Sequence, residues 1–388
     1  MALARKGFHA HLIEAGPAIG PPPSPDVFSA VESHGLTGQV AMRTETQAPR
    51  PYVAGAGVGG SALVNGMLKM LPAFGALARS WNVPGWTANR FAESAARVFG
   101  DVSARRGSRS HMDGLLESLL PVREAHYFGH GTRPNWPEAV QNAGVRLSGG
   151  TTVKRVVLEA GQARGVSCDD GLLYESNEVV LCAGAIESPR LLWRSQVVLP
   201  AIGRHVLDHP SLTFTACPPA QPELSRYLAI LSSESSRQDL LVTTYDARGL
   251  VVLTLLRTRS RGWLTATEIH LNQLSHTADR QALRSGVRQL GRVLPNATGA
   301  DGWTLADLAA MSDDALDTWM RQNEDGTYHI AGSCRMGPTA IDNVVDGDGK
   351  VFGATGLFVA DASIFPALPL ASPQATVMIV ADALATRW

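Results

Sequence analysis

Two segments in the last sixty residues carry side chains that could do chemistry. His329 stands in the run Tyr328-His-Ile-Ala-Gly-Ser-Cys-Arg-Met-Gly337, beside a tight Gly-Ser turn. An imidazole has an ordinary pKa of about 6.5 and can accept a proton near neutrality, so His329 is a candidate general base. Asp361 ends an apolar run that predicts a strand, and open α/β sheets bind ligands outside the carboxyl ends of their strands. The two segments predict a base beside a cofactor crevice.

A third candidate is a carboxylate near the N-terminal end. Residues 2–6 indicate a helix end stopped by Gly7, and residues 8–14 predict a short strand that ends in Glu14. In dinucleotide-binding βαβ units, such an acid binds the adenosine ribose about 20 residues after a glycine fingerprint. Counting back from Glu14 puts that fingerprint before Met1, so we expect the first strand and its glycine loop to be absent. The alternative is a surface carboxylate at a strand end.

The run Gly55-Ala-Gly-Val-Gly-Gly60 matches GxGxxG letter for letter, yet it does not predict a dinucleotide fingerprint. Two prolines precede it, no buried strand leads into it, and the next acid is Glu93, well beyond the expected spacing. Its glycines can still let the backbone approach a ligand. Gly59, Gly60, Ser61 and Asn65 then offer amide and hydroxyl donors, and a plain turn is the alternative.

The elements that must position these residues can be predicted along the chain. Residues 178–185 form an apolar run typical of a buried parallel strand, and a helix follows, with Ser188 as N-cap and Pro189 at its first position. Residues 151–166 predict a hairpin that begins at Val153. The loop 16–25 contains five prolines, which exclude regular structure there.

Further along, β-rich runs at 212–215, 227–231, 240–244 and 250–256 predict an antiparallel sheet. Residues 277–294 and 305–322 have helical patterns, the second with Thr304 as cap. We therefore expect a two-domain α/β (α+β) protein. Residues 1–75, 140–210 and 326–388 would form a discontinuous Rossmann-like cofactor domain, and 76–139 and 211–325 the substrate domain.

Composition limits the class of partner. The chain has 388 residues, is 45% hydrophobic, and has 34 Lys plus Arg against 35 Asp plus Glu, so nothing attracts nucleic acid or an anionic membrane. The four cysteines are far apart, which excludes a zinc site or a disulfide scaffold. No signal-peptide or membrane-spanning segment is evident. We expect a cytoplasmic enzyme with a small-molecule partner.

Several segments together resemble one known family. They occur in that family's order, at Leu12–Pro17, Val58–Met67, Val180–Pro189, Ile202–Pro210, Tyr328–Gly337 and Gly356–Ser363. The chain is similar to the glucose-methanol-choline (GMC) flavoprotein oxidoreductases over most of its length. Six ordered motifs are far more specific than any single one.

The resemblance implies FAD as cofactor and a small-molecule alcohol as substrate, with His329 as the base and hydride passing to flavin N5. It implies that Glu14 binds the ribose, that the backbone of Val153 meets the adenine, and that a further group lines the pyrophosphate and flavin. That group is Gly59, Gly60, Ser61, Asn65, Ala183, Gly184, Asp361 and Ala362. His205 and His209 are interpreted as structural. So are His126 and His130, which lack a third metal ligand.

One departure affects the active site. The family's second catalytic position, usually His or Asn, falls here on Pro373, which cannot hydrogen-bond an alcohol through its side chain. Ser372 and Pro373 predict a helix start, which would aim the free amides of Gln374 and Ala375 at the flavin and stabilise negative charge there. Gln374 could also replace the missing polar partner.

Two hypotheses follow for function. The chain is an FAD-dependent alcohol dehydrogenase or oxidase, or it is a truncated or degenerate family member that does not hold FAD and acts as a binding protein. The absent glycine loop favours the second, because its amides would supply charge-assisted hydrogen bonds of about 1.5–3 kcal/mol each to the pyrophosphate. The Pro-x-Ala-Thr string resembles the mycofactocin-associated branch, in which a redox cofactor takes the electrons. A protein electron acceptor is also compatible.

Overall fold

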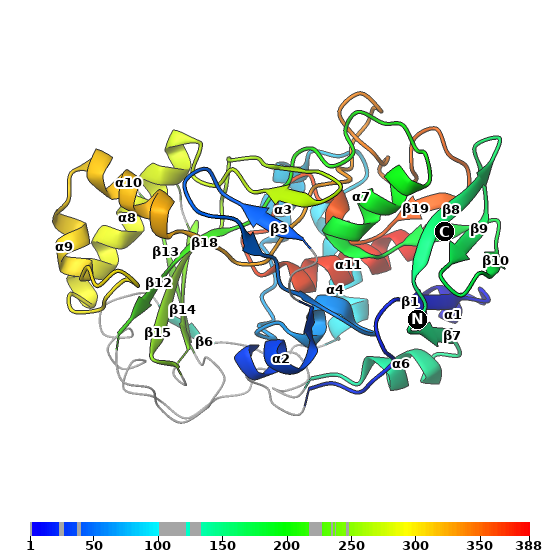
Figure 1. Ribbon diagram of the computed structural model, residues 1–388, viewed down its shortest axis with the longest axis horizontal. Helices are drawn as coiled ribbons and strands as arrows, with labels where there is room; N and C mark the ends of the chain where they lie inside the picture. Colours follow the sequence, from blue (N-terminus) through cyan, green and yellow to red (C-terminus); the bar gives the residue numbers. More distant parts are fainter. Residues whose placement is uncertain are drawn as a thin grey trace.

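The computed structural model describes residues 2–22, 27–36, 40–100, 122–124, 133–216, 227–233, 236, 238–245 and 248–388. These residues form two lobes that lie side by side, with both chain ends in the same lobe (Figure 1). His126 and His130, interpreted above as structural, lie outside the described residues.

The first lobe contains short parallel strand pairs. β1 (His11–Glu14) pairs with β7 (Arg146–Gly149), and β11 (Val179–Leu181) pairs with β19 (Leu357–Val359), both in parallel. β8 (Val153–Glu159), β9 (Gln162–Cys168) and β10 (Leu173–Glu175) form an antiparallel sheet, which confirms the predicted hairpin. The strand ending in Glu14 is confirmed too, after a one-turn helix α1 (Ala2–Arg5).

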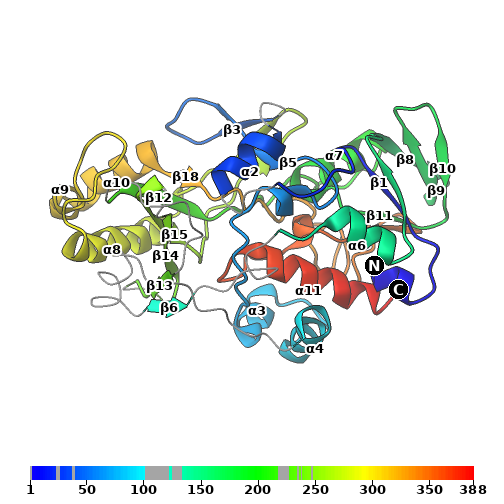
Figure 2. The same cartoon turned by 90° about the horizontal axis from the view of Figure 1, so that it is seen from below.

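Helices cover these strands. They are α3 (Phe74–Trp81), α4 (Ala88–Phe99), α6 (Trp136–Asn142), α7 (Gly184–Arg194) and α11 (Pro373–Ala385), with 3-10 turns η1 (Gly60–Leu63) and η4 (Ala362–Ile364). α11 runs through the lobe, with α4 against it and α3 against α4 (Figure 2). α4 and most of α3 come from segment 76–139, which the sequence assigned to the substrate domain, and both share the hydrophobic core of the first lobe.

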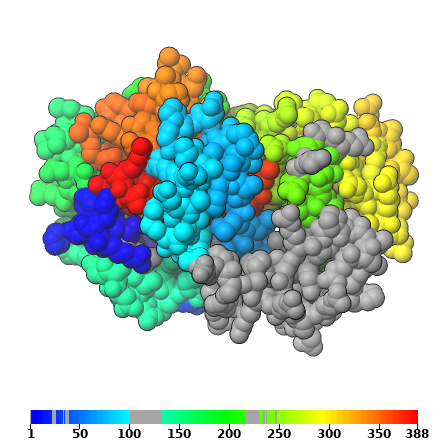
Figure 3. Space-filling view, turned by 180° about the vertical axis from the view of Figure 1, so that it is seen from behind, coloured from blue at the N-terminus to red at the C-terminus, as the bar shows by residue number. Residues whose placement is uncertain are grey.

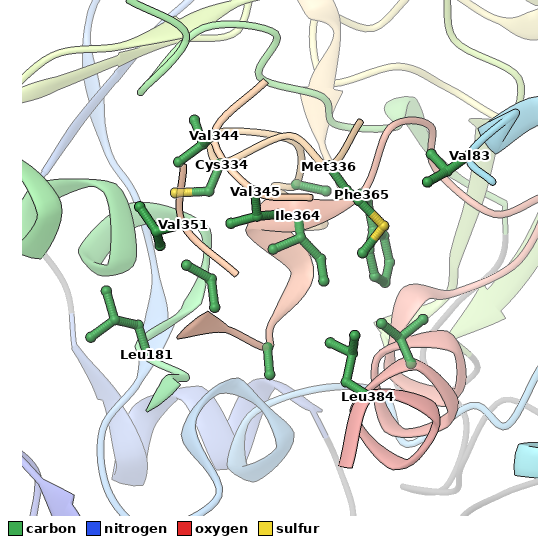
Figure 4. Close-up of a cluster of buried hydrophobic side chains, with 14 of the residues drawn as sticks. Val83, Leu181, Cys334, Met336, Val344, Val345, Val351, Ile364, Phe365 and Leu384 are labelled. Atoms are coloured by element: carbon green, nitrogen blue, oxygen red, sulfur yellow. The ribbon is translucent and has the colours of Figure 1, made fainter. Parts of the chain in front are cut away.

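The core of the first lobe is built around β11, β19 and α11. Leu181 and Leu384 face Val351, Ile364 and Phe365 there (Figure 4). These side chains come from segments separated by up to two hundred residues, so their burial joins the two halves of the discontinuous lobe. Hydrophobic burial of this kind contributes about 25 cal/mol per Å² of apolar surface.

The second lobe is an antiparallel sheet packed against helices. Its strand order is β18 (Asp325–Gly326), β12 (Pro210–Thr215), β15 (Leu250–Leu255), β14 (Leu240–Tyr245), β13 (Tyr227–Leu231) and β6 (Val122–Glu124), which confirms the predicted sheet. The helices are α8 (Thr277–Val293), α9 (Leu305–Ala310) and α10 (Asp313–Asn323). The prediction of one helix over 305–322 was wrong. The Ser312 side chain caps a new helix there by accepting a hydrogen bond from the amide of Ala315.

A smaller sheet lies where the lobes meet. It consists of β16 (Trp263–Leu264), β17 (Glu268–His270), β3 (Ala41–Arg43) and β4 (Arg50–Pro51); nearby are α2 (Val27–His34), β2 (Gly35–Leu36) and β5 (Ala54–Gly55). A 3-10 turn rather than an α-helix follows β5, in agreement with the rejection of Gly55–Gly60 as a dinucleotide fingerprint. Among the helices described, none is long and apolar enough to span a membrane.

Candidate active site

His329 lies in the loop after β18 and is held from several sides. Its backbone amide donates to Asp208 Oδ1 at 2.9 Å, and its Nδ1 lies 3.0 Å from Nδ1 of His209 and 2.9 Å from Oγ1 of Thr327. The two imidazole rings are perpendicular, with centroids 5.3 Å apart. Within the described part of the chain, no hydrogen bond reaches His329 Nε2. That nitrogen is therefore free to meet a ligand.

The surroundings keep both imidazoles neutral near pH 7. Burial lowers the pKa of His209 to about 4, and burial followed by the proximity of His209 lowers the pKa of His329 well below its usual value. The carbonyl groups of Leu256 and Pro369 partly oppose the shift at His209. Nε2 of His209 is buried and makes no hydrogen bond to a described residue, whereas Nδ1 contacts His329.

The tautomer of His209 decides that of His329. If His209 Nδ1 carries no proton, the 3.0 Å contact requires His329 Nδ1 to donate, with Thr327 Oγ1 as a second acceptor. Thr327 Oγ1 in turn lies 3.1 Å from the carbonyl oxygen of His209, to which its hydroxyl donates. The lone pair of His329 then sits on Nε2, the free nitrogen. The sequence interpretation of His209 as merely structural missed this contact, because 120 residues separate the two histidines along the chain.

Asp208 joins the two segments that carry the histidines. Its Oδ1 accepts from the amides of His209 and His329, at 2.8 and 2.9 Å, and lies 3.2 Å from Thr327 Oγ1. Burial raises its pKa to about 7, although these hydrogen bonds oppose the shift. The backbones of Leu207 and Ala331 also pair in both directions. The histidine pair is therefore held by backbone as well as side-chain bonds.

Glu324 is a second buried acid close to this loop. It is 1% exposed, and neither carboxylate oxygen has a hydrogen-bond partner among the residues described. Burial raises its pKa to about 8, which Arg50 opposes. Its backbone carbonyl accepts from Gln47 Nε2 and from Arg50, at 2.7 and 3.2 Å, which fixes the position of the residue.

The Glu324→Gln variant is expected to remove a pH dependence of stability. A raised folded-state pKa means that the stabilisation is complete below the unfolded value of 4.5 and is lost as the pH rises to about 8. In that window the free energy of unfolding of the variant should rise relative to the parent by up to about 1.4 kcal/mol per pH unit. Urea unfolding at several pH values measures it, with exposed Glu93→Gln as control. Parallel curves for parent and variant would contradict the assignment.

Asp361 connects the ends of β11 and β19. Its Oδ2 accepts from the Gly184 amide at 2.9 Å and from Ser188 Oγ at 2.5 Å, and its Oδ1 accepts from the Ser363 amide at 2.8 Å. The predicted N-cap at Ser188 was wrong: α7 begins at Gly184 with Ala183 as N-cap, and Pro189 lies inside the helix. The Ser188 hydroxyl is used by Asp361 instead. Ala183, Gly184 and Ala362 thus lie together at the carboxyl ends of two parallel strands.

A glycine-rich loop meets the end of β1. Glu14 Oε1 accepts from the Gly16 amide at 2.8 Å, and burial raises the pKa of this carboxyl against the effect of the Gly16 and Gly57 amides. A Cβ on Gly16 would lie 2.2 Å from Gly57 N, and one on Gly59 would lie 2.3 Å from Trp136 Cδ1. Both positions therefore exclude any side chain.

The same glycine-rich loop contacts the start of α11 through Asn65. Gly59 and Gly60 have positive φ, Ser61 Oγ accepts from the Gly55 amide at 3.4 Å, and Asn65 Nδ2 donates to Gln374 Oε1. Ser372 is the N-cap residue of α11, but its side chain makes no capping bond, so the amides of Gln374 and Ala375 have no side-chain cap. Val153 opens β8 and is half-buried.

Arg133 was not predicted. It is 8% exposed, and its guanidinium donates to the backbone carbonyl of Asn65 at 2.8 Å and to Asn65 Oδ1 at 3.3 Å. It thereby orients the amide that contacts Gln374. An isolated arginine between a threonine and a proline gives no sequence signal for this role. In the described ranges, no three His, Cys, Asp or Glu side chains are grouped as metal ligands.

Comparisons with known proteins agree with this geometry. Two GMC oxidoreductase family models match residues 130–211 and 256–381, together more than half of the chain. An oxygen-dependent choline dehydrogenase of Chromohalobacter salexigens is 27% identical over 54% of this chain and 50% of that protein. A 5-(hydroxymethyl)furfural oxidase of Methylovorus sp. is 27% identical over 55% of this chain and 51% of that protein. The chain spans about half the length of these curated relatives.

Solved structures share the fold. Pyridoxine 4-oxidase from Mesorbium loti superposes with a TM-score of 0.81 at 22% identity, covering 100% of this chain and 96% of that one. An FAD-dependent oxidoreductase from Chaetomium thermophilum gives 0.81 at 18% identity, covering 99% and 96%. The predicted two-lobed α/β fold is confirmed. The family models, the ordered motifs and the shared fold lead to one conclusion: the chain belongs to the GMC oxidoreductase family.

Proposed function

We propose that the protein is an FAD-dependent oxidoreductase acting on the CH–OH group of small-molecule alcohols, with His329 as the base. The observation that carries this proposal is the histidine pair, in which His329 Nδ1 is engaged by His209 and Thr327 while Nε2 is free. The names of relatives, a choline dehydrogenase and a hydroxymethylfurfural oxidase, support an alcohol as substrate.

The role of His329 follows from its protonation state. Because its pKa is lowered, the imidazole is neutral near pH 7 and can take the hydroxyl proton of an alcohol at Nε2. The proton on Nδ1 stays in place, because His209 and Thr327 accept it. FAD, when bound, supplies the acceptor for the hydride that leaves the carbinol carbon.

The residues present fit FAD. Carboxyl ends of parallel strands present Glu14 and, beside Asp361, the backbone of Gly184, and the glycine loop leaves no room for side chains at Gly16 and Gly59. Buried Trp136 Nε1 and Thr376 Oγ1 have no partner among described residues, so two donors are left for a ligand. We propose that Glu14 holds the ribose, Val153 the adenine, and that the pyrophosphate and flavin contact Gly59, Gly60, Ser61, Asn65, Ala183, Gly184, Asp361, Ala362, Gln374 and Ala375.

Gln374 is proposed as the polar partner of His329, because Pro373 occupies the position where the family usually has His or Asn. Its Oε1 is engaged by Asn65, which leaves the side-chain Nε2 as a donor toward the substrate oxygen. The uncapped start of α11 supports stabilisation of negative charge by the amides of Gln374 and Ala375.

Three finer assignments belong to the proposal. The domain boundaries given above are proposed with one change, the move of α3 and α4 to the cofactor domain, whose core they share. The mycofactocin-associated branch is proposed as well, with a redox cofactor or a protein as electron acceptor. Cys168, Cys182 and Cys334 are free thiols, which supports a reducing, cytoplasmic location. Hydrogen peroxide release during alcohol turnover in air would distinguish an oxidase from a dehydrogenase.

The test is whether the purified chain retains FAD. We expect a yellow protein whose denaturation releases FAD in about equal molar amount, or a colourless protein that takes up FAD on titration. Failure of the purified chain to retain or take up FAD would favour the alternative, a binding protein without redox activity.

A further inference from the structure

A cavity of about 250 Å³ lies between the start of α3, the segment 256–261 and the loop 367–370. Leu256 lines it and Pro369 lies in this loop, and the carbonyl groups of both face His209, but neither His209 nor His329 lines the cavity. The segment that contains α3, light blue in Figure 3, lies against the yellow-green part of the chain on that face of the molecule. The volume of the cavity lies just below the range of small-molecule sites, which is about 300–1,000 Å³. None of the residues assigned above to FAD or to the base lines it.

The cavity is strongly basic. Arg257, Arg259 and Arg261 all line it, whereas the whole chain has a net charge of −1. Arg257 and Arg259 are exposed, and neither guanidinium has an ion pair or hydrogen bond with a residue that the structure describes. Arg261 is more buried and donates to the carbonyls of Thr258 and Ser260, at 3.1 and 2.9 Å. Three like charges in one concavity repel one another unless an anion joins them.

The arginines are carried by a fixed backbone. Asp279, at the start of α8, accepts from the amides of Arg259 and Ser260 and from the hydroxyls of Thr258 and Ser260, at 2.7 to 3.1 Å. Asp279 and Asp239 line a smaller adjoining cavity together with Arg257 and Arg259. Asp239 is engaged by the amide and hydroxyl of Ser233, at 2.8 and 2.7 Å. The hydrogen bonds of both carboxylates thus come from donors other than the guanidiniums, although the Asp279 charge also acts on Arg261.

The opposite wall combines an uncapped helix start with apolar side chains. Ala73 is the N-cap residue of α3 and provides no side-chain cap, so the positive end of this eight-residue helix borders the cavity. Leu77, Leu256, Leu368 and Leu370 supply apolar surface. We propose that this cavity binds a small amphipathic organic anion, a carboxylate or phosphate on an apolar body. The guanidiniums would meet the charge and the leucines the apolar part.

Calorimetric titration with octanoate tests the proposal on the purified chain. We expect saturable binding that weakens with salt, and no binding of the neutral isostere octanamide. Arg257→Gln and Arg259→Gln should each weaken octanoate about tenfold, the loss of one charge-assisted hydrogen bond. Arg292→Gln removes an exposed arginine from the far end of α8 and should leave the affinity unchanged. Octyl phosphate in a parallel titration shows which anion is preferred.

Octanoate binding requires neither FAD nor His329, so the proposed anion site can fail this test while the proposed function stands. Octanamide binding as tightly as octanoate, or arginine variants matching the Arg292 control, would overturn the proposal. Absence of octanoate and octyl phosphate binding at millimolar concentration would overturn it as well.

Discussion

Replacing His329 with alanine is expected to slow reduction of the bound flavin by an alcohol by about 10²–10⁴-fold, the usual contribution of a general base. The reason is the loss of Nε2, the nitrogen on which the contacts of His209 and Thr327 leave the lone pair. Rapid mixing of FAD-loaded protein with alcohol in the absence of oxygen measures the rate. The FAD content of the variant should be unchanged.

The control for this variant is His9→Ala, because His9 is an exposed histidine at some distance along the chain. It should reduce flavin at the parental rate. Equal rates for the His329 variant and the parent would remove His329 from the role of base, whatever the cofactor content.

Asp361→Ala is expected to lower the free energy of unfolding by about 2–4 kcal/mol. The change leaves the Gly184 amide, the Ser188 hydroxyl and the Ser363 amide without their shared acceptor. It also disconnects the ends of β11 and β19, which come from distant parts of the chain. Urea unfolding measures the change. The midpoint urea concentration should fall, while the slope of the free energy of unfolding against urea concentration stays constant.

Asp342 provides the matched control, since it is exposed and makes no side-chain hydrogen bond to any described residue. Asp342→Ala should change the free energy of unfolding by less than about 0.5 kcal/mol. If both aspartate variants unfold at the same urea concentration, Asp361 does not join the two strands energetically.

Local patterns in the sequence predicted the elements well. The Gly-containing turn after residue 159 predicted the hairpin of β8 and β9, and the apolar run before Ala183 predicted β11, because both depend on nearest neighbours. The acid at the end of β1 was also predicted. The break between α9 and α10 was missed, because one serine cap outweighs a continuous helical pattern.

Tertiary contacts were harder to predict. Ser188 has the residue type of an N-cap, but Asp361 from a distant segment takes its hydroxyl. His209 gave no signal of its contact with His329, because a single histidine before a proline is compatible with many structures. The role of Arg133 likewise depends on a loop folding back onto Asn65. In each case the sequence supplied the residue and the fold supplied its partner.

The central claim is that this chain holds FAD where His329 can deprotonate an alcohol. The most direct measurement is the visible absorption of the FAD-loaded protein after anaerobic mixing with a panel of alcohols, including choline, 5-(hydroxymethyl)furfural and pyridoxine. The account predicts that at least one alcohol bleaches the flavin band, and that a substrate deuterated at the carbinol carbon does so more slowly. A bound flavin that dithionite reduces but no alcohol in the panel does would contradict it.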